Sequence, residues 1–268
     1  SSIDNNYDAA HAWDEGVAFY AGSLEGTEGA GSGKMIAALA DKRCQNFGTC
    51  GASGSATSGI AKANIDFFAL SAEARDYLYS GQCSLVRPVL TEVIKKMAIP
   101  LIQGTYRYAY KVGANGPGGS GVNGAGSNTL LKENAEGAIF AHAVLPLVHA
   151  VSASAATTIY TNMKVGEFSP DRAAVKAAFE SVLPLLGISC DEIGALNVAG
   201  GLATASDAFG VACSDSTPQT YERIYGYLPY SKVTDHNAID LDQAAMEVEL
   251  GLRTSAGMTA AKAIYTQG

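Results

Sequence analysis

Residues 9–24 read AAHAWDEGVAFYAGSL and contain the clearest helical pattern of this chain. Trp13, Val17 and Tyr20 are spaced three or four positions apart, which places their side chains on one face of an α-helix. Asp8, immediately before this stretch, is a residue type that commonly caps the first helical turn. The stretch therefore predicts an amphipathic helix that buries one face against the rest of the protein.

The same spacing of apolar residues returns along the chain, and the long alternating runs of β-branched residues that are typical of strands are missing. Pro100 is expected to end one helix, and Pro146 is expected to bend another. We therefore predict an all-α multi-helix bundle with long glycine-rich loops. The expected helices cover residues 9–22, 35–39, 60–79, 84–97, 101–112, 128–159, 169–187 and 241–265.

Two short motifs occur twice in the sequence. Residues 13–19 and 134–140 share the pattern x-x-Glu-Gly-x-x-Phe, and residues 81–87 and 166–172 share Gly-x-x-Ser-x-x-Arg. These matches indicate a duplicated helical unit, although two short matches also arise by chance. The expected organisation is a single domain over residues 1–268, with related halves over 1–121 and 128–268 as the finer hypothesis.

The net charge and motif content exclude several classes of protein. The chain has 268 residues, a net charge of −8 and only 18 Lys and Arg residues, which argues against binding to nucleic acid or anionic membranes. No apolar run reaches roughly eighteen residues, so no transmembrane segment is expected. The motifs GxSxG and HExxH are absent, and residues 29–35, GAGSGKM, lack the Ser or Thr of a phosphate-binding loop. We therefore expect a protein that is not an enzyme.

The five cysteines fall into local groups. Cys44 and Cys50 flank a short loop, Cys190 and Cys213 flank a segment rich in Gly and Ala, and Cys83 stands apart. This spacing predicts disulfides within the two groups, with Cys83 as a free buried thiol, and such bonds indicate an oxidising compartment. The alternative is a cytosolic protein with five free, buried cysteines.

One group of polar residues on the first predicted helix has the spacing of a metal site. His11, Asp14 and Glu15 occupy positions i, i+3 and i+4, which lie on one helical face. Glu133 and Glu136 have a similar spacing, and Glu136 matches Glu15 in the repeat. If the two helices pack together, these carboxylates meet, and carboxylates with a histidine suit iron in a helical bundle. The alternative is that they are solvated residues in the first turns of helices.

A second candidate metal site lies in the sequence Tyr-Arg-Tyr-Ala-Tyr over residues 106–110. Tyr106 and Tyr110 share a helical face, with Arg107 beside them. Phenolate oxygens can bind ferric iron, and an arginine can hold a carbonate ion through two parallel hydrogen bonds. Aromatic residues at helical spacing are also typical of a protein core, which is the alternative interpretation.

Three blocks of sequence resemble one known family. Residues 11–26, HAWDEGVAFYAGSLEG, are similar to the recurrent AWDE-x-x-AFY-x-GS-x-EG segment of the algal iron-assimilation (FEA) family of low-iron-inducible periplasmic proteins. Residues 136–148 with 159–163 resemble the second block of this family, and residues 174–179 with 186–190 resemble a third.

The resemblance implies a secreted, periplasmic or cell-surface protein that binds iron, ferric rather than ferrous, and passes it to a cell-surface uptake system. The related phytotransferrins imply carbonate or bicarbonate as a co-ligand. No ligand motif of the family can be carried over to particular residues. Because some members are linked to high carbon dioxide, a bicarbonate-responsive surface protein without an iron role is an alternative. A carboxylate-bridged metal enzyme and a structural wall protein are the others.

Overall fold

The computed structural model describes residues 5–24, 33–113, 116–197, 209, 245–246, 248–252 and 254–267. The chain divides into two compact units, Ser1–Thr217 and Pro218–Gly268. The longest described helix of the second unit is α11 (Ser255–Gln267). All the predicted site residues belong to the first unit.

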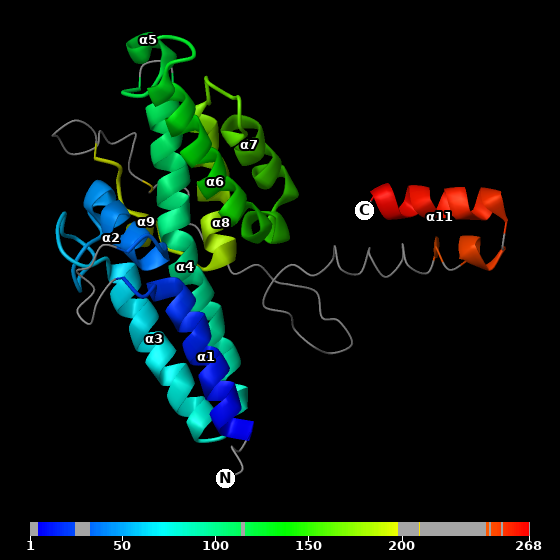
Figure 1. The fold of residues 1–268 in the computed structure, drawn as a ribbon, viewed down its shortest axis with the longest axis horizontal. Coiled ribbons are helices and arrows are strands. Elements are labelled where there is room, and N and C mark those ends of the chain that lie inside the picture. The colour runs from blue at the N-terminus through cyan, green and yellow to red at the C-terminus, as the bar shows by residue number, and fades with distance from the viewer. Residues whose placement is uncertain are drawn as a thin grey trace. The chain divides into compact units, whose positions relative to one another are not determined.

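The described residues form helices and no strands, apart from isolated bridges of Cys50 with Ala56 and Ala61. The predicted all-α multi-helix bundle is therefore confirmed (Figure 1). Within the described ranges, each helix is too short or too polar to cross a membrane. The helices of the first unit are α1 (Asn5–Ala21), α2 (Ile36–Phe47), α3 (Lys62–Tyr79), α4 (Cys83–Val112), α5 (Ser120–Asn123), α6 (Asn128–Val151), α7 (Ala153–Met163), α8 (Arg172–Leu186) and α9 (Cys190–Ile193).

The long helix α4 organises the packing of the first unit (Figure 1). Near its N-terminus, Val89 and Val93 join a buried apolar cluster with Tyr20 of α1 and Phe67 of α3. Further along, α4 contributes to a larger apolar cluster with α6, α7 and α8, in which Phe179 is fully buried. Removal of these apolar surfaces from water is the main force that assembles the helices. One helix therefore connects two separate cores.

The predicted break at Pro100 is wrong, because α4 continues without interruption through Pro88 and Pro100. Proline removes one N–H donor from a helix, but the φ angle that it fixes is compatible with helical backbone. Pro100 is buried, and its neighbours Ile99 and Ile102 are buried in the larger core. Packing of these side chains against the surrounding helices stabilises the continuous helix despite the lost hydrogen bond.

The single helix expected over residues 128–159 is two helices. The backbone of Ser152 is extended, with φ −160° and ψ 102°, and its side chain accepts a hydrogen bond from the backbone N–H of Ala155. Ser152 therefore ends α6 and caps α7, as serine commonly does. The change of direction lets α7 pack back against α6, while Pro146 lies inside α6.

The disulfide prediction is confirmed for Cys44 and Cys50, whose Cα atoms are 4.9 Å apart. Cys190 is also disulfide-bonded, and its predicted partner Cys213 lies outside the described residues. Cys83 is a free thiol, but its predicted burial is wrong, because it lies exposed in the first turn of α4. A disulfide of this kind hints at folding in an oxidising compartment.

Candidate metal and anion site

The predicted ligands on the first helix lie on the exposed face of α1. His11, Asp14 and Glu15 are all exposed, and Nε2 of His11 lies 3.5 Å from Oε1 of Glu15. The opposite face of α1 packs against α2 and α3, where the indole N–H of Trp13 donates a hydrogen bond to the carbonyl oxygen of Ser71 at 3.0 Å. These three polar side chains therefore face away from the core.

Glu15 and Glu136 are not brought together by the fold. α1 packs mainly against α3 and α2, whereas α6 packs mainly against α4, α7 and α8. In Figure 1 the two helices lie beside different parts of α4. The helix contact on which the predicted pairing of these carboxylates depended is therefore not made.

The two tyrosines predicted as ligands have different surroundings. Tyr106 is buried, and its ring centroid lies 6.5 Å from that of Phe47 and 5.1 Å from that of Phe209. Tyr110 is half-buried, and the guanidinium carbon of Arg172 lies 5.3 Å from its ring centroid. The ring of Tyr106 therefore contributes to the core, whereas Tyr110 lies at its edge.

Tyr108, between these two tyrosines, connects α4 to α6. Its hydroxyl group donates a hydrogen bond to the carboxylate of Glu136, and its ring stacks on that of Phe140, with centroids 5.5 Å apart. Gly137 permits this close approach, because a Cβ atom there would lie 2.8 Å from Cβ of Tyr108. Our sequence reasoning did not single out Tyr108, although a glycine inside an apolar helix is a signal of close packing.

Glu133, one turn before Gly137 on α6, is buried and forms an ion pair with Lys111 of α4. Part of the glycine-rich run covers this pair, since the backbone N–H of Gly118 donates to the carbonyl oxygen of Lys111 at 3.0 Å. A Cβ atom at Gly118 would lie 2.8 Å from Cγ of Glu133. This part of the glycine-rich segment therefore lies against the end of α4 and helps to bury a carboxylate.

Two arginines complete this group of polar side chains. Arg43 of α2 is only 8% exposed, and its Nε and Nη1 atoms have no hydrogen-bond partner among the described residues. Its guanidinium group lies near Tyr108, which opposes the lowering of the pKa of Arg43. The guanidinium carbon of Arg107 lies 5.7 Å from the centroid of the Tyr108 ring. We name as the Tyr108 cluster the residues Arg43, Arg107, Tyr108, Lys111, Glu133 and Glu136.

Burial and neighbouring charges shift two pKa values in the Tyr108 cluster. Burial, followed by the hydrogen bond and negative charge of Glu136, raises the pKa of Tyr108 to about 12. Burial also lowers the pKa of Arg43, and the positive charge of Arg107 lowers it further. An arginine nevertheless stays protonated in proteins, so the cluster holds a buried cation beside a phenol that is neutral at physiological pH.

Within the part of the chain that the structure describes, no three His, Cys, Asp or Glu side chains converge to hold a metal ion. The Tyr108 cluster instead combines two carboxylates with a phenol, and both groups provide the hard oxygen ligands that ferric iron prefers. A metal ion bound there would therefore need the tyrosine, an added anion, or both to complete its coordination.

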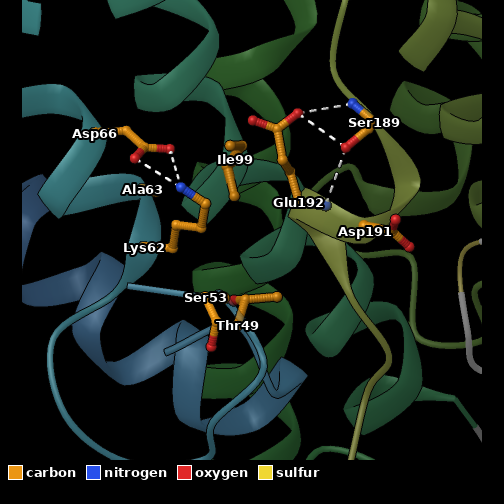
Figure 2. A pocket seen from close by; sticks show the side chains of 10 residues that line it. Thr49, Ser53, Lys62, Ala63, Asp66, Ile99, Ser189, Asp191 and Glu192 are labelled. Atoms are coloured by element: carbon orange, nitrogen blue, oxygen red, sulfur yellow. Dashed lines mark hydrogen bonds and ion pairs between the residues drawn. The ribbon is translucent and has the colours of Figure 1, made fainter. Parts of the chain in front are cut away.

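A second polar site is a cavity of about 220 Å³ between α3, α4, α9 and the loop after the disulfide (Figure 2). Lys62 and Asp66 line one side, where the amine lies 2.8 and 2.9 Å from the two carboxylate oxygens. Glu192 lines the other side and accepts a hydrogen bond from the backbone N–H of Ser189 at 2.8 Å. Among the charged side chains drawn there, Lys62 and Asp66 pair with each other, and Glu192 is hydrogen-bonded to Ser189.

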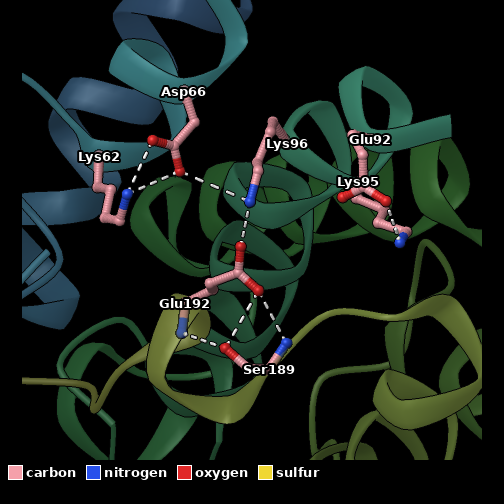
Figure 3. A network of polar contacts seen from close by, with 7 residues as sticks. All are labelled: Lys62, Asp66, Glu92, Lys95, Lys96, Ser189 and Glu192. Atoms are coloured by element: carbon pink, nitrogen blue, oxygen red, sulfur yellow. Dashed lines mark hydrogen bonds and ion pairs between the residues drawn. The ribbon is translucent and has the colours of Figure 1, made fainter. Parts of the chain in front are cut away.

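Lys96 joins the two sides of this cavity into one network (Figure 3). Its amine pairs with Glu192 and lies 3.6 Å from Oδ2 of Asp66. Burial alone would raise the pKa of Glu192, but the hydrogen bonds from Lys96 and Ser189 outweigh it and hold that pKa below its ordinary value. The network therefore fastens α9 to α3 and α4, and we interpret it as structural.

We expect Glu192→Gln to lower the free energy of unfolding by about 1–3 kcal/mol near neutral pH, because it removes a charged hydrogen bond to Lys96. The folded pKa of Glu192 lies below its ordinary value of 4.5, so its contribution to stability is present above that value and is lost as the pH falls below it. Chemical denaturation at several pH values measures both effects. In the matched control Glu92→Gln, whose pair with Lys95 is more exposed, the loss should stay below about 1 kcal/mol. Equal losses in the two variants would contradict the structural interpretation.

Comparisons with known proteins do not assign the chain to a family. No protein-family model, curated protein or solved structure matches it. The function is therefore inferred from the Tyr108 cluster and from the sequence resemblance.

Proposed function

We propose that the protein captures ferric iron outside the plasma membrane and delivers it to a cell-surface uptake system, with carbonate or bicarbonate as a co-ligand. The observation that supports this most directly is the phenol of Tyr108, which is hydrogen-bonded to Glu136 and lies near Glu133. Arg43 and Arg107 lie beside the same ring. Oxygen ligands next to arginines suit a ferric ion with a bound oxyanion.

In this proposal, iron binding rearranges side chains that already interact. Glu133 is paired with Lys111 in the metal-free protein, so Lys111 must give up this ion pair when the carboxylate turns to iron. Tyr108 and Glu136 exchange their mutual hydrogen bond for bonds to the metal. A carbonate held by the arginines fills further positions, because two carboxylates and one phenolate leave a ferric ion with open coordination sites.

Iron binding at Tyr108 must release a proton. The pKa of this phenol is raised to about 12, so the metal-free side chain is protonated at neutral pH, whereas a ligand must be deprotonated. Protons therefore compete with iron, and affinity falls as the pH is lowered. This behaviour would favour release of iron in an acidic environment.

The extracytoplasmic part of the proposal is supported by the Cys44–Cys50 disulfide, since such bonds persist in oxidising compartments. The resemblance to the FEA family supports it independently. A specific observation also favours a second candidate function, a bicarbonate-responsive surface protein without an iron role. Arg43 and Arg107 could bind an anion without any metal.

Calorimetric titration with ferric iron, supplied as a weak chelate, tests this function. We expect one equivalent to bind in bicarbonate buffer, with lower affinity when bicarbonate is removed and when the buffer is mildly acidic. Repeating the titration in buffers of different ionisation enthalpy counts the protons released. If iron does not bind under any of these conditions, the iron proposal is wrong, and binding of bicarbonate alone would support the second candidate.

A further inference from the structure

The C-terminal part of α1 and the residues just before α2 border an apolar groove of about 630 Å³. Three large apolar side chains that line it are exposed to solvent: Phe19 is 74%, Leu24 62% and Met35 41% exposed. A single exposed apolar residue is ordinary, but several that share one concave surface are typical of an interaction site. The groove shares no residue with the Tyr108 cluster, so its occupant does not depend on the proposed function.

Phe19 is the most exposed of these three side chains. It lies on a different face of α1 from Trp13, Val17 and Tyr20, which pack against the apolar cluster inside the first unit. A helix fixes the direction of each of its side chains, so Phe19 cannot join that cluster while α1 keeps its packing. Its burial therefore requires a partner that covers the groove.

The two charged residues of the groove have opposite signs and lie at different ends. Glu15 lies one turn before Phe19 on α1. Lys34 adjoins Met35, and a Cβ atom at Gly22, just after the end of α1, would lie 2.6 Å from Cγ of Met35. Seven residues lead from Glu15 to Gly22, which is about 10 Å along a helix. An apolar centre with an acid at one end and a base at the other is complementary to a copy of itself turned by a twofold axis.

We propose that this groove is the interface of a homodimer, and that its occupant is the C-terminal part of α1 from a second copy of the chain. The two α1 helices run antiparallel across a twofold axis near Phe19, and each Phe19 side chain is buried against the groove of the other copy. Glu15 of one copy then faces Lys34 of the other, and the same pair forms again on the opposite side of the axis.

Sedimentation velocity of the full chain, without iron and at low salt, tests this dimer over concentrations of about 1–100 µM. We expect the dimer fraction of the parent protein to rise with concentration. Phe19→Ser should raise the dissociation constant at least about a hundredfold, because each dimer loses two buried aromatic side chains. The matched control is Ile139→Ser on α6, since Ile139 is 68% exposed and lies outside the groove. It should dimerise like the parent protein, and circular dichroism should show that both variants keep the fold.

Charge reversal tests the antiparallel arrangement. Glu15→Lys alone and Lys34→Glu alone should each raise the dissociation constant roughly five- to thirtyfold, because each change places like charges at both pairs. An equimolar mixture of the two variants should dimerise like the parent protein, since a dimer with one copy of each has opposite charges at both pairs again. A local defect within either variant would not be repaired by mixing.

The proposal is overturned if the parent protein stays monomeric at about 100 µM, a concentration at which even weak specific dimers are populated. That result would leave the groove to a different protein or to residues 25–32 of the same chain, which connect Leu24 to Gly33. It is also overturned if Phe19→Ser dimerises as well as Ile139→Ser, or if the two charge-reversed variants associate no more strongly when mixed than alone.

Discussion

Tyr108→Phe is expected to weaken ferric iron binding by about tenfold to a hundredfold or more. Loss of a residue that only hydrogen-bonds to a metal ligand already weakens metal binding by about this factor. The substitution removes only the hydroxyl group that bonds to Glu136, and it leaves the ring stacked on Phe140. Ferric iron bound to a phenolate absorbs visible light through charge transfer. We therefore expect the parent protein with iron to be coloured and the variant to be colourless, as measured by absorption spectroscopy and calorimetry.

Three control variants separate this site from the other predicted locations. Tyr79→Phe changes an exposed tyrosine and should have no effect on affinity. Tyr110→Phe tests the site predicted from tyrosine spacing, and Glu15→Gln tests the exposed group on α1. A loss of affinity in Glu15→Gln, with normal binding in Tyr108→Phe, would move the metal site to α1 and contradict the proposal.

Gly137→Ala is expected to destabilise the protein by about 1–3 kcal/mol, which is typical of overpacking in a well-packed interior. The new Cβ atom would lie 2.8 Å from Cβ of Tyr108 and 2.9 Å from Cε of Met163. Met163 can move the end of its flexible side chain, but Cβ of Tyr108 is fixed to the backbone of α4. The helices must therefore separate, and the Tyr108 hydroxyl should shift away from Glu136, so iron affinity should fall as well.

The matched control is Gly16→Ala, since Gly16 is the counterpart of Gly137 in the sequence repeat. Gly16 lies on α1, and a Cβ atom there would have no other atom within 4 Å. Alanine in an open helical position should stabilise the protein by about 0.5–1 kcal/mol relative to glycine. Denaturant unfolding of both variants measures the difference. If both variants are destabilised to a similar extent, the close contact between α4 and α6 is not what distinguishes Gly137 from Gly16.

The helical class of this protein was predictable because helix formation depends on local spacing. Trp13, Val17 and Tyr20 recur at helical intervals, and in the structure their side chains join one apolar cluster. The bond between Cys44 and Cys50 was also predictable, since residues six positions apart meet readily. The helix break predicted at Pro100 was wrong because contacts between distant segments decide the structure there. Burial among side chains from these segments outweighs the local tendency of proline to end a helix.

The composition of the candidate site was only partly accessible from sequence. Glu133, Glu136 and Arg107 were identified by residue type and spacing, and all three belong to the Tyr108 cluster. Arg43 and Tyr108 were not, because one lies in α2 and the other in α4, and nothing in the spacing within either helix shows that they face each other.

Sequence by itself indicated that the chain is helical, that Cys44 and Cys50 pair, and which residue types are present to bind a cation or an anion, but it did not indicate the helix bounds at Pro100 and Ser152. Tertiary structure decided which of these residues share one environment. It left the carboxylate of Glu15 on an exposed face of α1, and it buried the guanidinium of Arg43 beside Tyr108 without a carboxylate partner in the described residues. The physical reason is that burial and charge compensation depend on contacts between helices, and the order of residues within one helix does not contain that information.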